Sequence, residues 1–256
     1  MKREINGVNL NVLEQGSGPL TLVFLHYFGG SAQEWQVVMS QLSGNYRCLA
    51  VDLRGCGDSD APASGYSVED MADDVAGLLK AVSVQKFVLI GHSMSGKVAL
   101  QLAARQPDGL RKVLLVSPSP PRPEPIPDKD RREMLETHGQ RSAAEQTFAE
   151  ITVRPVSDVV KEQIIADNLR TSAAAWNAWL TLGSKEDITD QMGSVNVPIA
   201  IIVGAEDKAL SPDVQPELTT PYLKNVTIDT VDGAGHLLPW ETPNELSNFI
   251  RKKITD

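Results

Sequence analysis

Three side chains of this chain could together carry out nucleophilic catalysis: Ser93, Asp207 and His236. A serine hydroxyl becomes a good nucleophile when an imidazole takes its proton, and a carboxylate can hold that imidazole in the required tautomer. The three residues stand in the order Ser, Asp, His, and each follows a stretch that is expected to form a strand. The pattern therefore predicts an acid–base-assisted serine nucleophile.

The stretch 87–97 has the pattern of a nucleophile elbow, a sharp turn from a strand into a helix. Ser93 lies at the turn, and Gly91, Ser95 and Gly96 supply the small side chains that such a close turn requires. The positive end of the following helix would then face the same space as the serine. A serine that opens a helix is also a common N-cap, so this stretch alone leaves a purely structural role open.

The acid partner of the histidine has a rival in the sequence. Glu206 precedes Asp207, so either carboxylate could orient His236, although we favour Asp207. Asp232 stands too close to His236 along the chain to be its expected partner.

The other polar candidates are expected to be structural. His92 flanks the serine and should point into packing, His26 should fix the loop after its strand by hydrogen bonds, and His138 should be solvated. We expect Asp52 and Arg54 to stabilise a turn as a pair rather than to act as a second acid site.

Apolar strand patterns alternate with helical patterns along most of the chain. A hairpin is expected in 4–15, where Asn6-Gly7 favours a tight turn. Alternation of this kind predicts an α/β fold with a mostly parallel, doubly wound sheet, and ligand sites in such sheets form at the carboxyl ends of the strands. The expected strands are 20–25, 46–53, 87–92, 110–116, 199–203 and 226–231, and the expected helices are 34–42, 67–82 (capped by Ser67), 94–106 and 242–252.

One block interrupts the alternation. Six prolines fall between Pro118 and Pro127 and predict an exposed, stiff connection. Four helical patterns and no strand follow, at about 130–138, 142–151, 157–169 and 172–182. We therefore expect residues 118–190 to form a helical cap over one end of a core built from residues 1–117 and 191–256.

The motifs together resemble the α/β-hydrolase family. The resemblance rests on the loop from His26, the turn 52–59, the elbow at Ser93, the acid Asp207 and the pair Gly235-His236. It implies an α/β-hydrolase fold with a helical cap, catalysis by Ser93, Asp207 and His236, and no cofactor or metal.

The family resemblance also implies an oxyanion hole, formed by the backbone amides of Phe28 and Met94. Three positions depart from the family pattern. Tyr27 stands where glycine is usual, which affects the shape of the oxyanion hole, and Cys56 stands where histidine is common. Ser95 stands where glycine or alanine is usual and resembles hormone and stress-sensor relatives such as strigolactone and karrikin receptors.

Four aromatic residues are candidates for substrate binding: Tyr27, Trp176, Trp179 and Trp240. Trp176 and Trp179 are three residues apart on an expected helix, so they share one face. Packing of the cap onto the sheet would explain them equally well. Trp240 follows His236 closely and could shield the site from water.

Composition excludes several other roles. The net charge of −9 argues against nucleic acid or an anionic membrane as a partner, because both attract basic surfaces. We expect no membrane-spanning segment and no secretory signal, since no long apolar run occurs. Two cysteines favour free thiols in a reducing compartment, so we expect a cytoplasmic protein, while its oligomeric state stays open.

The sequence thus predicts a serine hydrolase that cleaves a small or medium carboxylic ester, in the manner of a carboxylesterase. Lactonase or enol-lactonase, thioesterase and perhydrolase activities share the same triad and remain alternatives. A carbon–carbon bond hydrolase is less favoured because no basic pocket is evident. The alternative of another class is a ligand receptor on the same fold, with very slow turnover.

Overall fold

The expected strands assemble into one eight-stranded sheet in the computed structural model, which describes residues 1–255. The strand order is β1-β2-β4-β3-β5-β6-β7-β8, and every pair from β4 to β8 is parallel. The strands are β1 Lys2–Ile5, β2 Val8–Gln15, β3 Thr21–Leu25, β4 Arg47–Val51, β5 Phe87–His92, β6 Leu110–Val116, β7 Ile199–Gly204 and β8 Val226–Val231.

The first two strands form the expected hairpin at one edge of the sheet. β1 pairs antiparallel with β2, and β2 pairs antiparallel with β4. Asn6 and Gly7 connect them with φ angles of 52° and 77°, the left-handed region that a two-residue hairpin turn requires and that Asn-Gly favours.

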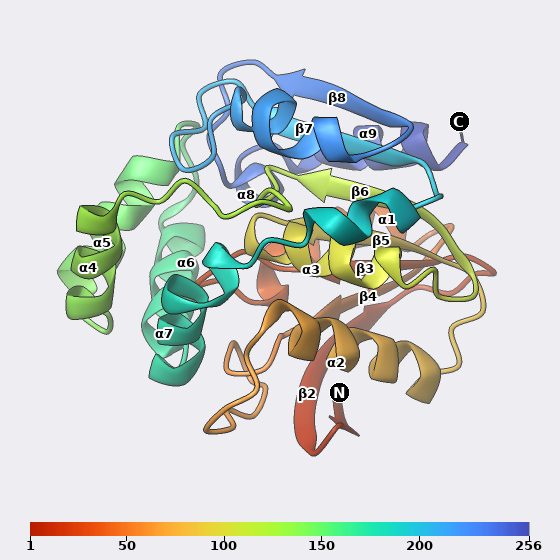
Figure 1. Cartoon of the computed structure of the whole chain (residues 1–256), viewed down its shortest axis with the longest axis horizontal. Coiled ribbons are helices and arrows are strands. Elements are labelled where there is room, and N and C mark those ends of the chain that lie inside the picture. The colour runs from red at the N-terminus through yellow and green to blue at the C-terminus, as the bar shows by residue number, and fades with distance from the viewer. Residues whose placement is uncertain (256) are drawn as a thin grey trace.

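Alternate side chains of the central strands enter two different apolar layers. In β3, Leu22 and Phe24 pack with α1 (Gln36–Leu42) and α9 (Pro243–Thr255) on one face. Val23 and Leu25 pack on the other face with α2 (Val68–Ala81) and α3 (Met94–Ala104). The centre of the sheet is therefore buried between two helical layers (Figure 1), which explains why its central parallel strands are apolar on both faces.

The start of α2 illustrates how the sequence sets an element boundary. The Ser67 hydroxyl accepts from the backbone amide of Asp70 at 3.0 Å, and the Asp70 carboxylate accepts from the amide of Ser67 at 2.9 Å. This reciprocal capping box satisfies two amides that a helix leaves unpaired, so the expected cap is confirmed.

Two helical boundaries differ from expectation. The helix expected at 34–42 is divided into a 3₁₀ turn, Ala32–Trp35, followed by α1. A short helix, α8 (Leu238–Glu241), precedes α9. The first change follows the loop after β3, and the second follows the loop after β8.

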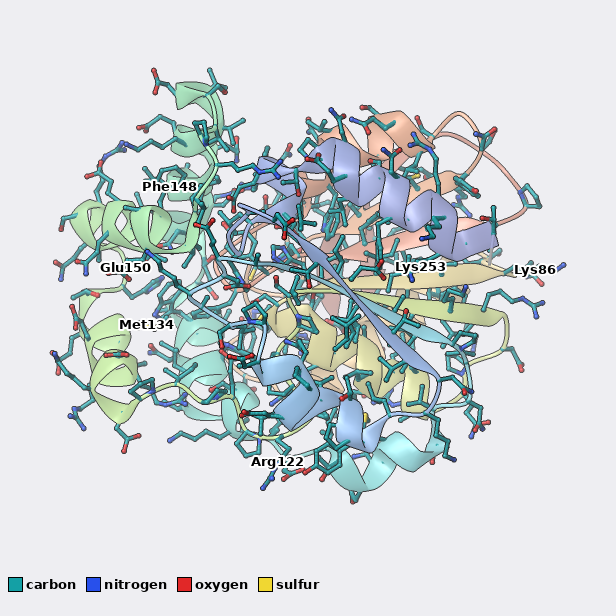
Figure 2. The ribbon with its side chains drawn as sticks, turned by 90° about the horizontal axis from the view of Figure 1, so that it is seen from above. Lys86, Arg122, Met134, Phe148, Glu150 and Lys253 are labelled. Carbon is teal, nitrogen blue, oxygen red and sulfur yellow. The ribbon has the colours of Figure 1, made fainter. Side chains whose placement is uncertain are left out.

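Four helices fill the long connection between β6 and β7, in agreement with the four helical patterns. They are α4 Asp128–Thr137, α5 Arg141–Ile151, α6 Asp158–Arg170 and α7 Ala173–Thr181. Figure 1 shows them grouped beside the sheet, and Figure 2 shows Met134, Phe148 and Glu150 of this block far from Lys86, which precedes β5. The helical insertion therefore lies toward the carboxyl ends of the parallel strands.

Candidate active site

Ser93 lies at a sharp turn between β5 and α3. Its backbone has φ 52° and ψ −120°, an unfavourable conformation for a residue with a side chain. The Ser93 amide donates to the Val116 carbonyl at 2.9 Å, and the Ser93 carbonyl accepts from the amide of Gly96 at 2.8 Å. The turn is thus held from both sides, and the serine keeps 8% of its surface exposed.

Small residues around Ser93 are required by contact distances. A Cβ on Gly91 would lie 2.5 Å from the carbonyl oxygen of Ser95, so no larger residue fits there. The Ser95 hydroxyl donates to the Leu25 carbonyl at 2.8 Å and accepts from the amide of His92 at 3.0 Å. Ser95 thereby joins the elbow to the end of β3, which gives this departure from the family pattern a structural explanation.

His236 and Asp207 form a buried pair. Asp207 Oδ2 lies 2.7 Å from His236 Nδ1, and both residues are about 3% exposed. The other carboxylate oxygen, Oδ1, accepts from the amides of Ala209 and Leu210 at 2.9 and 3.0 Å. Asp207, and not its neighbour Glu206, is therefore the carboxylate that orients this imidazole through Nδ1–H.

The two partners shift each other's pKa in opposite directions. Burial lowers the pKa of His236, but the Asp207 carboxylate outweighs burial and raises it above the ordinary value. Burial likewise raises the pKa of Asp207, and the His236 ring outweighs it and lowers the value overall. The pair consequently favours an imidazolium beside a carboxylate, the charge state that forms when His236 takes a proton.

The His236 loop lies against the elbow. His92 Nε2 is 3.0 Å from the carbonyl oxygen of His236, and the two imidazole rings are 5.2 Å apart between centroids. A Cβ on Gly204, at the end of β7, would lie 2.1 Å from the Gly235 carbonyl oxygen, so a glycine is needed for this approach. Within residues 1–255 no hydrogen bond joins the Ser93 hydroxyl to the His236 ring in this geometry.

The loop after β3 lies on the other side of Ser93. His26 contacts the Tyr27 carbonyl oxygen through Nδ1 at 2.8 Å and accepts from the amide of Leu53 through Nε2 at 3.0 Å, so it fixes the loop as expected. Phe28 and Met94 line a small, partly enclosed cavity of about 10 Å³, which is about the room for one water molecule. The two residues predicted to form the oxyanion hole therefore border one apolar recess.

Tyr27 does not line that recess. Its ring is 5% exposed and packs with Ile164 of α6 and with Leu237, next to His236. A Cβ on Gly30 would lie 2.4 Å from the Tyr27 ring, so the second glycine of the loop makes room for this departure from the family pattern.

The tryptophans occupy different environments. Trp179 lines the recess, whereas Trp176 packs on Phe28 with ring centroids 4.3 Å apart and donates from Nε1 to the Met134 carbonyl at 2.9 Å. Trp240 is partly buried in the apolar cluster of Tyr27. The helical insertion therefore contributes one recess-lining tryptophan and one that supports Phe28.

Comparison with known proteins identifies the family. A model described as "Alpha/beta hydrolase family" matches residues 22–248. This chain belongs to the alpha/beta hydrolase family. Its sheet and flanking helices form the α/β-hydrolase fold.

A curated relative supports hydrolase activity at a coarse level, and solved structures share the fold. The hydrolase is 29% identical, over 96% of its own length and 93% of the relative's, to a 2-(acetamidomethylene)succinate hydrolase of Mesorhizobium japonicum. An esterase from Exiguobacterium antarcticum superposes with a TM-score of 0.92 at 19% identity, covering 100% of this chain and 99% of that one. An enol-lactonase from Burkholderia xenovorans LB400 superposes with a TM-score of 0.87 at 23% identity, covering 100% of both chains.

Two glutamates of the hydrolase contact the histidine region and were not found by sequence reasoning. Glu34 approaches His92 Nδ1 with both carboxyl oxygens, at 3.1 and 3.2 Å. Glu241 accepts from four backbone amides, those of Val153, Arg154, Gly235 and Leu237, at 2.7–3.0 Å. Glu34 lies in the first turn of the expected helix 34–42, where an acidic residue is common, so no local signal distinguished it.

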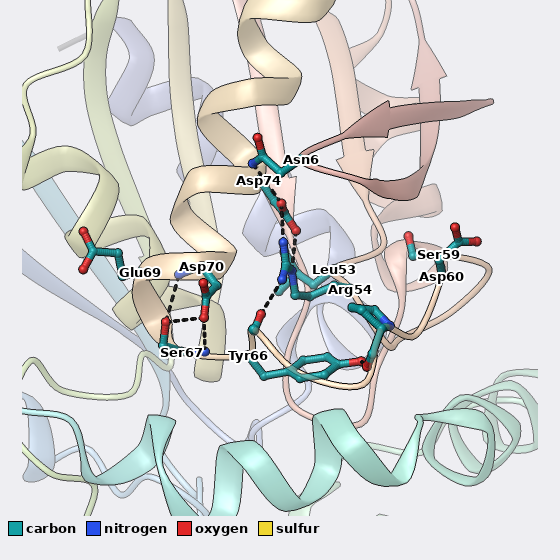
Figure 3. A network of polar contacts seen from close by, with 12 residues as sticks. Asn6, Leu53, Arg54, Ser59, Asp60, Tyr66, Ser67, Glu69, Asp70 and Asp74 are labelled. Atoms are coloured by element: carbon teal, nitrogen blue, oxygen red, sulfur yellow. Dashed lines mark hydrogen bonds and ion pairs between the residues drawn. The ribbon is translucent and has the colours of Figure 1, made fainter.

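The expected pairing of Asp52 with Arg54 is wrong. Arg54 donates to both oxygens of Asp74 in α2, at 2.6 and 2.7 Å, and also to the Gly65 carbonyl (Figure 3). Asp52 instead accepts from the amide of Ala32 at 2.7 Å and from the amide of Asp58 at 2.8 Å. The arginine side chain reaches a helix that lies far along the sequence, and a turn pattern cannot indicate that contact.

His138, expected to be solvated, is partly buried. Its ring stacks on Trp176 at 4.5 Å, and partial burial lowers its pKa.

Within the described chain no group of three or more histidine, cysteine or acidic side chains could hold a metal ion. No helix among residues 1–255 is both long and apolar enough to cross a membrane.

Proposed function

We propose that this hydrolase cleaves small carboxylic esters through an acyl-enzyme on Ser93. The observation that carries the proposal is the buried contact of 2.7 Å between His236 and Asp207 in the loop that lies against the strained turn at Ser93. His236 would take the Ser93 proton as the hydroxyl attacks the ester carbonyl, and would return it to the leaving alcohol. Water would then hydrolyse the acyl-enzyme by the same route.

The amides of Phe28 and Met94 are our candidates for the oxyanion hole. Met94 is the first residue of α3, where backbone N–H groups are not used within the helix. Removal of one such donor typically costs about 10²–10³ in kcat. The recess behind these two residues would receive the acyl chain, and its small volume favours acetyl over longer groups.

The charged side chains near the recess already have protein partners, which favours a neutral substrate. Arg54 lines the recess and donates to both oxygens of Asp74. Lys97 is fully buried on α3, but its ammonium donates to the carbonyls of Arg122 and Glu186, both at 2.9 Å. Burial lowers the pKa of Lys97 to about 8. An anionic substrate would have to displace these contacts, so the lysine supports the connection of the helical insertion to α3.

We propose that residues 118–190 act as a cap over the site and that the protein works in the cytoplasm. Thr171, Ala175 and Trp179 of the insertion close the recess from above, opposite Leu53 and Met94 of the core. Cys48 and Cys56 are both buried free thiols, which suits a reducing compartment.

The test is hydrolysis of p-nitrophenyl esters, acetate through octanoate, by the protein and by Ser93→Ala. We expect turnover that is fastest with acetate and that Ser93→Ala abolishes. Equal rates for the two proteins would show that Ser93 is not the nucleophile. A stoichiometric burst without turnover would contradict the hydrolase proposal and favour a ligand receptor.

A further inference from the structure

A second acid–histidine pair lies behind the proposed catalytic one. His92 is fully buried at the end of β5, and Glu34 of the 3₁₀ turn Ala32–Trp35 is 1% exposed. His92 Nδ1 lies 3.1 Å from the nearer Glu34 oxygen, and His92 Nε2 lies 3.0 Å from the His236 carbonyl oxygen. The three residues form a continuous chain of contacts that ends on the backbone of the catalytic histidine.

The contacts of the His92 ring determine where its proton lies. A carbonyl oxygen can only accept, so His92 Nε2 must carry hydrogen to bond with the His236 carbonyl. In a neutral imidazole the other nitrogen, Nδ1, is then an acceptor. If Glu34 were ionised, its carboxylate and Nδ1 would both be acceptors, with no hydrogen between them. A protonated Glu34 can instead donate its hydrogen to Nδ1. An ionised Glu34 beside a neutral His92 would therefore lack a proton that this contact needs. The pair must hold one additional proton.

Burial decides between the two ways to hold that proton. The neutral arrangement is a Glu34 carboxylic acid with a neutral His92, and the ionic one is a carboxylate with an imidazolium. Burial raises the pKa of Glu34 well above its ordinary value and lowers that of His92 to about 3, so both groups favour the neutral form. A buried carboxylic acid that stays neutral in order to donate is a known use of this effect.

A neutral His92 also suits the chemistry of its neighbour. The His92 and His236 rings are 5.2 Å apart, and His236 becomes an imidazolium during each proposed proton transfer. A charged His92 would repel that imidazolium. The charged or titratable groups near His92 are His236, Asp207, Glu241 and Tyr27, and those near Glu34 are His26, His236, Asp167 and Tyr27.

We propose that Glu34 and His92 form an uncharged relay that positions His236. Glu34 is protonated and donates a hydrogen bond to His92 Nδ1. His92 Nε2–H in turn donates to the backbone carbonyl of His236 and holds it in place. The relay rests on the proposed function for its effect on catalysis. Neither residue touches the reacting atoms, so both are positioning residues.

Kinetics of three variants test the positioning role. Glu34→Gln keeps a donor at the same place and should keep kcat within about threefold. Glu34→Leu keeps a side chain of similar size but has no donor. It should lower kcat about 10- to 100-fold with KM little changed, because His236 is no longer held in position. Glu69→Gln, at a glutamate whose side chain is 70% exposed on α2, is the matched control and should equal the wild type. Wild-type kcat in Glu34→Leu, or a loss in Glu34→Gln as large as in Glu34→Leu, would overturn the proposal.

Nuclear magnetic resonance tests the proton's position without any substrate. The chain has four histidines, so ¹⁵N signals of the imidazoles can be assigned by single substitutions, including His92→Asn. We expect His92 to show hydrogen on Nε2 and a bare Nδ1 from pH 5 to 8. Hydrogen on Nδ1 would overturn the proposal, even if the protein hydrolysed no ester. Conversely, an active Ser93→Ala would overturn the proposed function and leave this spectrum unaffected.

Discussion

At the level of single residues, the acids around His236 differ in what their oxygens face. Asp207 and Glu241 accept hydrogen bonds from N–H groups. Glu34 contacts Nδ1 of His92, whose other nitrogen, Nε2, donates to the His236 carbonyl. Because glutamine copies the size of glutamate but replaces one acceptor by a donor, the same substitution should have opposite consequences at Glu34 and Glu241.

The pH dependence of kcat/KM should report the state of His236. Only the neutral imidazole can take the Ser93 proton, and Asp207 raises the His236 pKa above 6.5. The rate should therefore fall as the pH decreases through a value above 6.5. A profile measured with p-nitrophenyl acetate from pH 5 to 9 checks this, and an acidic limb centred below pH 6 would contradict it.

The free energy of unfolding of the wild type should fall relative to that of Glu34→Gln as the pH rises. The folded state keeps a proton on the pair whereas the unfolded glutamate releases it above about pH 4.5, so folding binds a proton there. The free energy of unfolding should fall relative to the variant by about 1.4 kcal/mol per pH unit. Denaturant titrations at pH 5.5, 6.5 and 7.5 provide the measurement, and a difference that does not change with pH would contradict the assignment.

At the level of elements, the sequence patterns predicted what periodicity and turn chemistry control. The β1–β2 hairpin, the parallel strands and the helices of the insertion all appear, because their apolar spacing is local. The partners of Glu34, Arg54 and Glu241 could not be predicted in the same way. His92 is 58 residues from Glu34, and Asp74 is 20 residues from Arg54, so only the assembled fold brings them together.

One contact of this kind joins the helical insertion to the histidine loop. The His236 amide donates to the Ile151 carbonyl at 2.9 Å, at the end of α5. Glu241, at the end of α8, accepts from amides of both segments: Val153 and Arg154 after α5, and Gly235 and Leu237 around the histidine. A shift of the insertion would thus be transmitted directly to His236.

Glu241→Gln should weaken this connection. Glutamine keeps one oxygen, which can still accept from the three amides that share Oε2, but it places an NH2 group against the buried amide of Leu237 that binds Oε1. We therefore expect a loss of about 2–3 kcal/mol in the free energy of unfolding. Hydrogen exchange should accelerate most at Leu237. The control is Glu245→Gln, which removes only a partly exposed ion pair with Arg154 and should cost less than about 1 kcal/mol. Equal losses in both variants would contradict the account.

At the level of the whole molecule, the recess belongs to both parts of the chain. The core supplies Phe28, Leu53 and Met94, and the insertion supplies Ala175 and Trp179. In the proposed mechanism the size of the acyl group would therefore be set where the two parts meet, which no single segment of the sequence could indicate. The proposed catalytic residues, in contrast, could be predicted, because each follows a strand that ends at the same edge of the sheet.

Enlarging the recess should change the preferred substrate. Trp179→Leu removes the bulk of a 3% exposed ring, so the optimum should move from acetate toward butyrate or longer esters. Trp240→Leu, at an aromatic residue outside the recess, is the matched control and should keep the wild-type order. An unchanged chain-length profile in Trp179→Leu would show that the acyl group binds elsewhere.

The most direct test of the central claim is covalent labelling by a fluorophosphonate. An activated serine displaces fluoride from phosphorus and keeps the phosphonyl group, so intact-mass analysis counts the adducts and peptide mass spectrometry locates them. We predict one adduct per chain, on Ser93, absent from Ser93→Ala and strongly slowed in His236→Ala. Labelling at another residue, or equal labelling of Ser93→Ala, would contradict the assignment of Ser93 as the nucleophile.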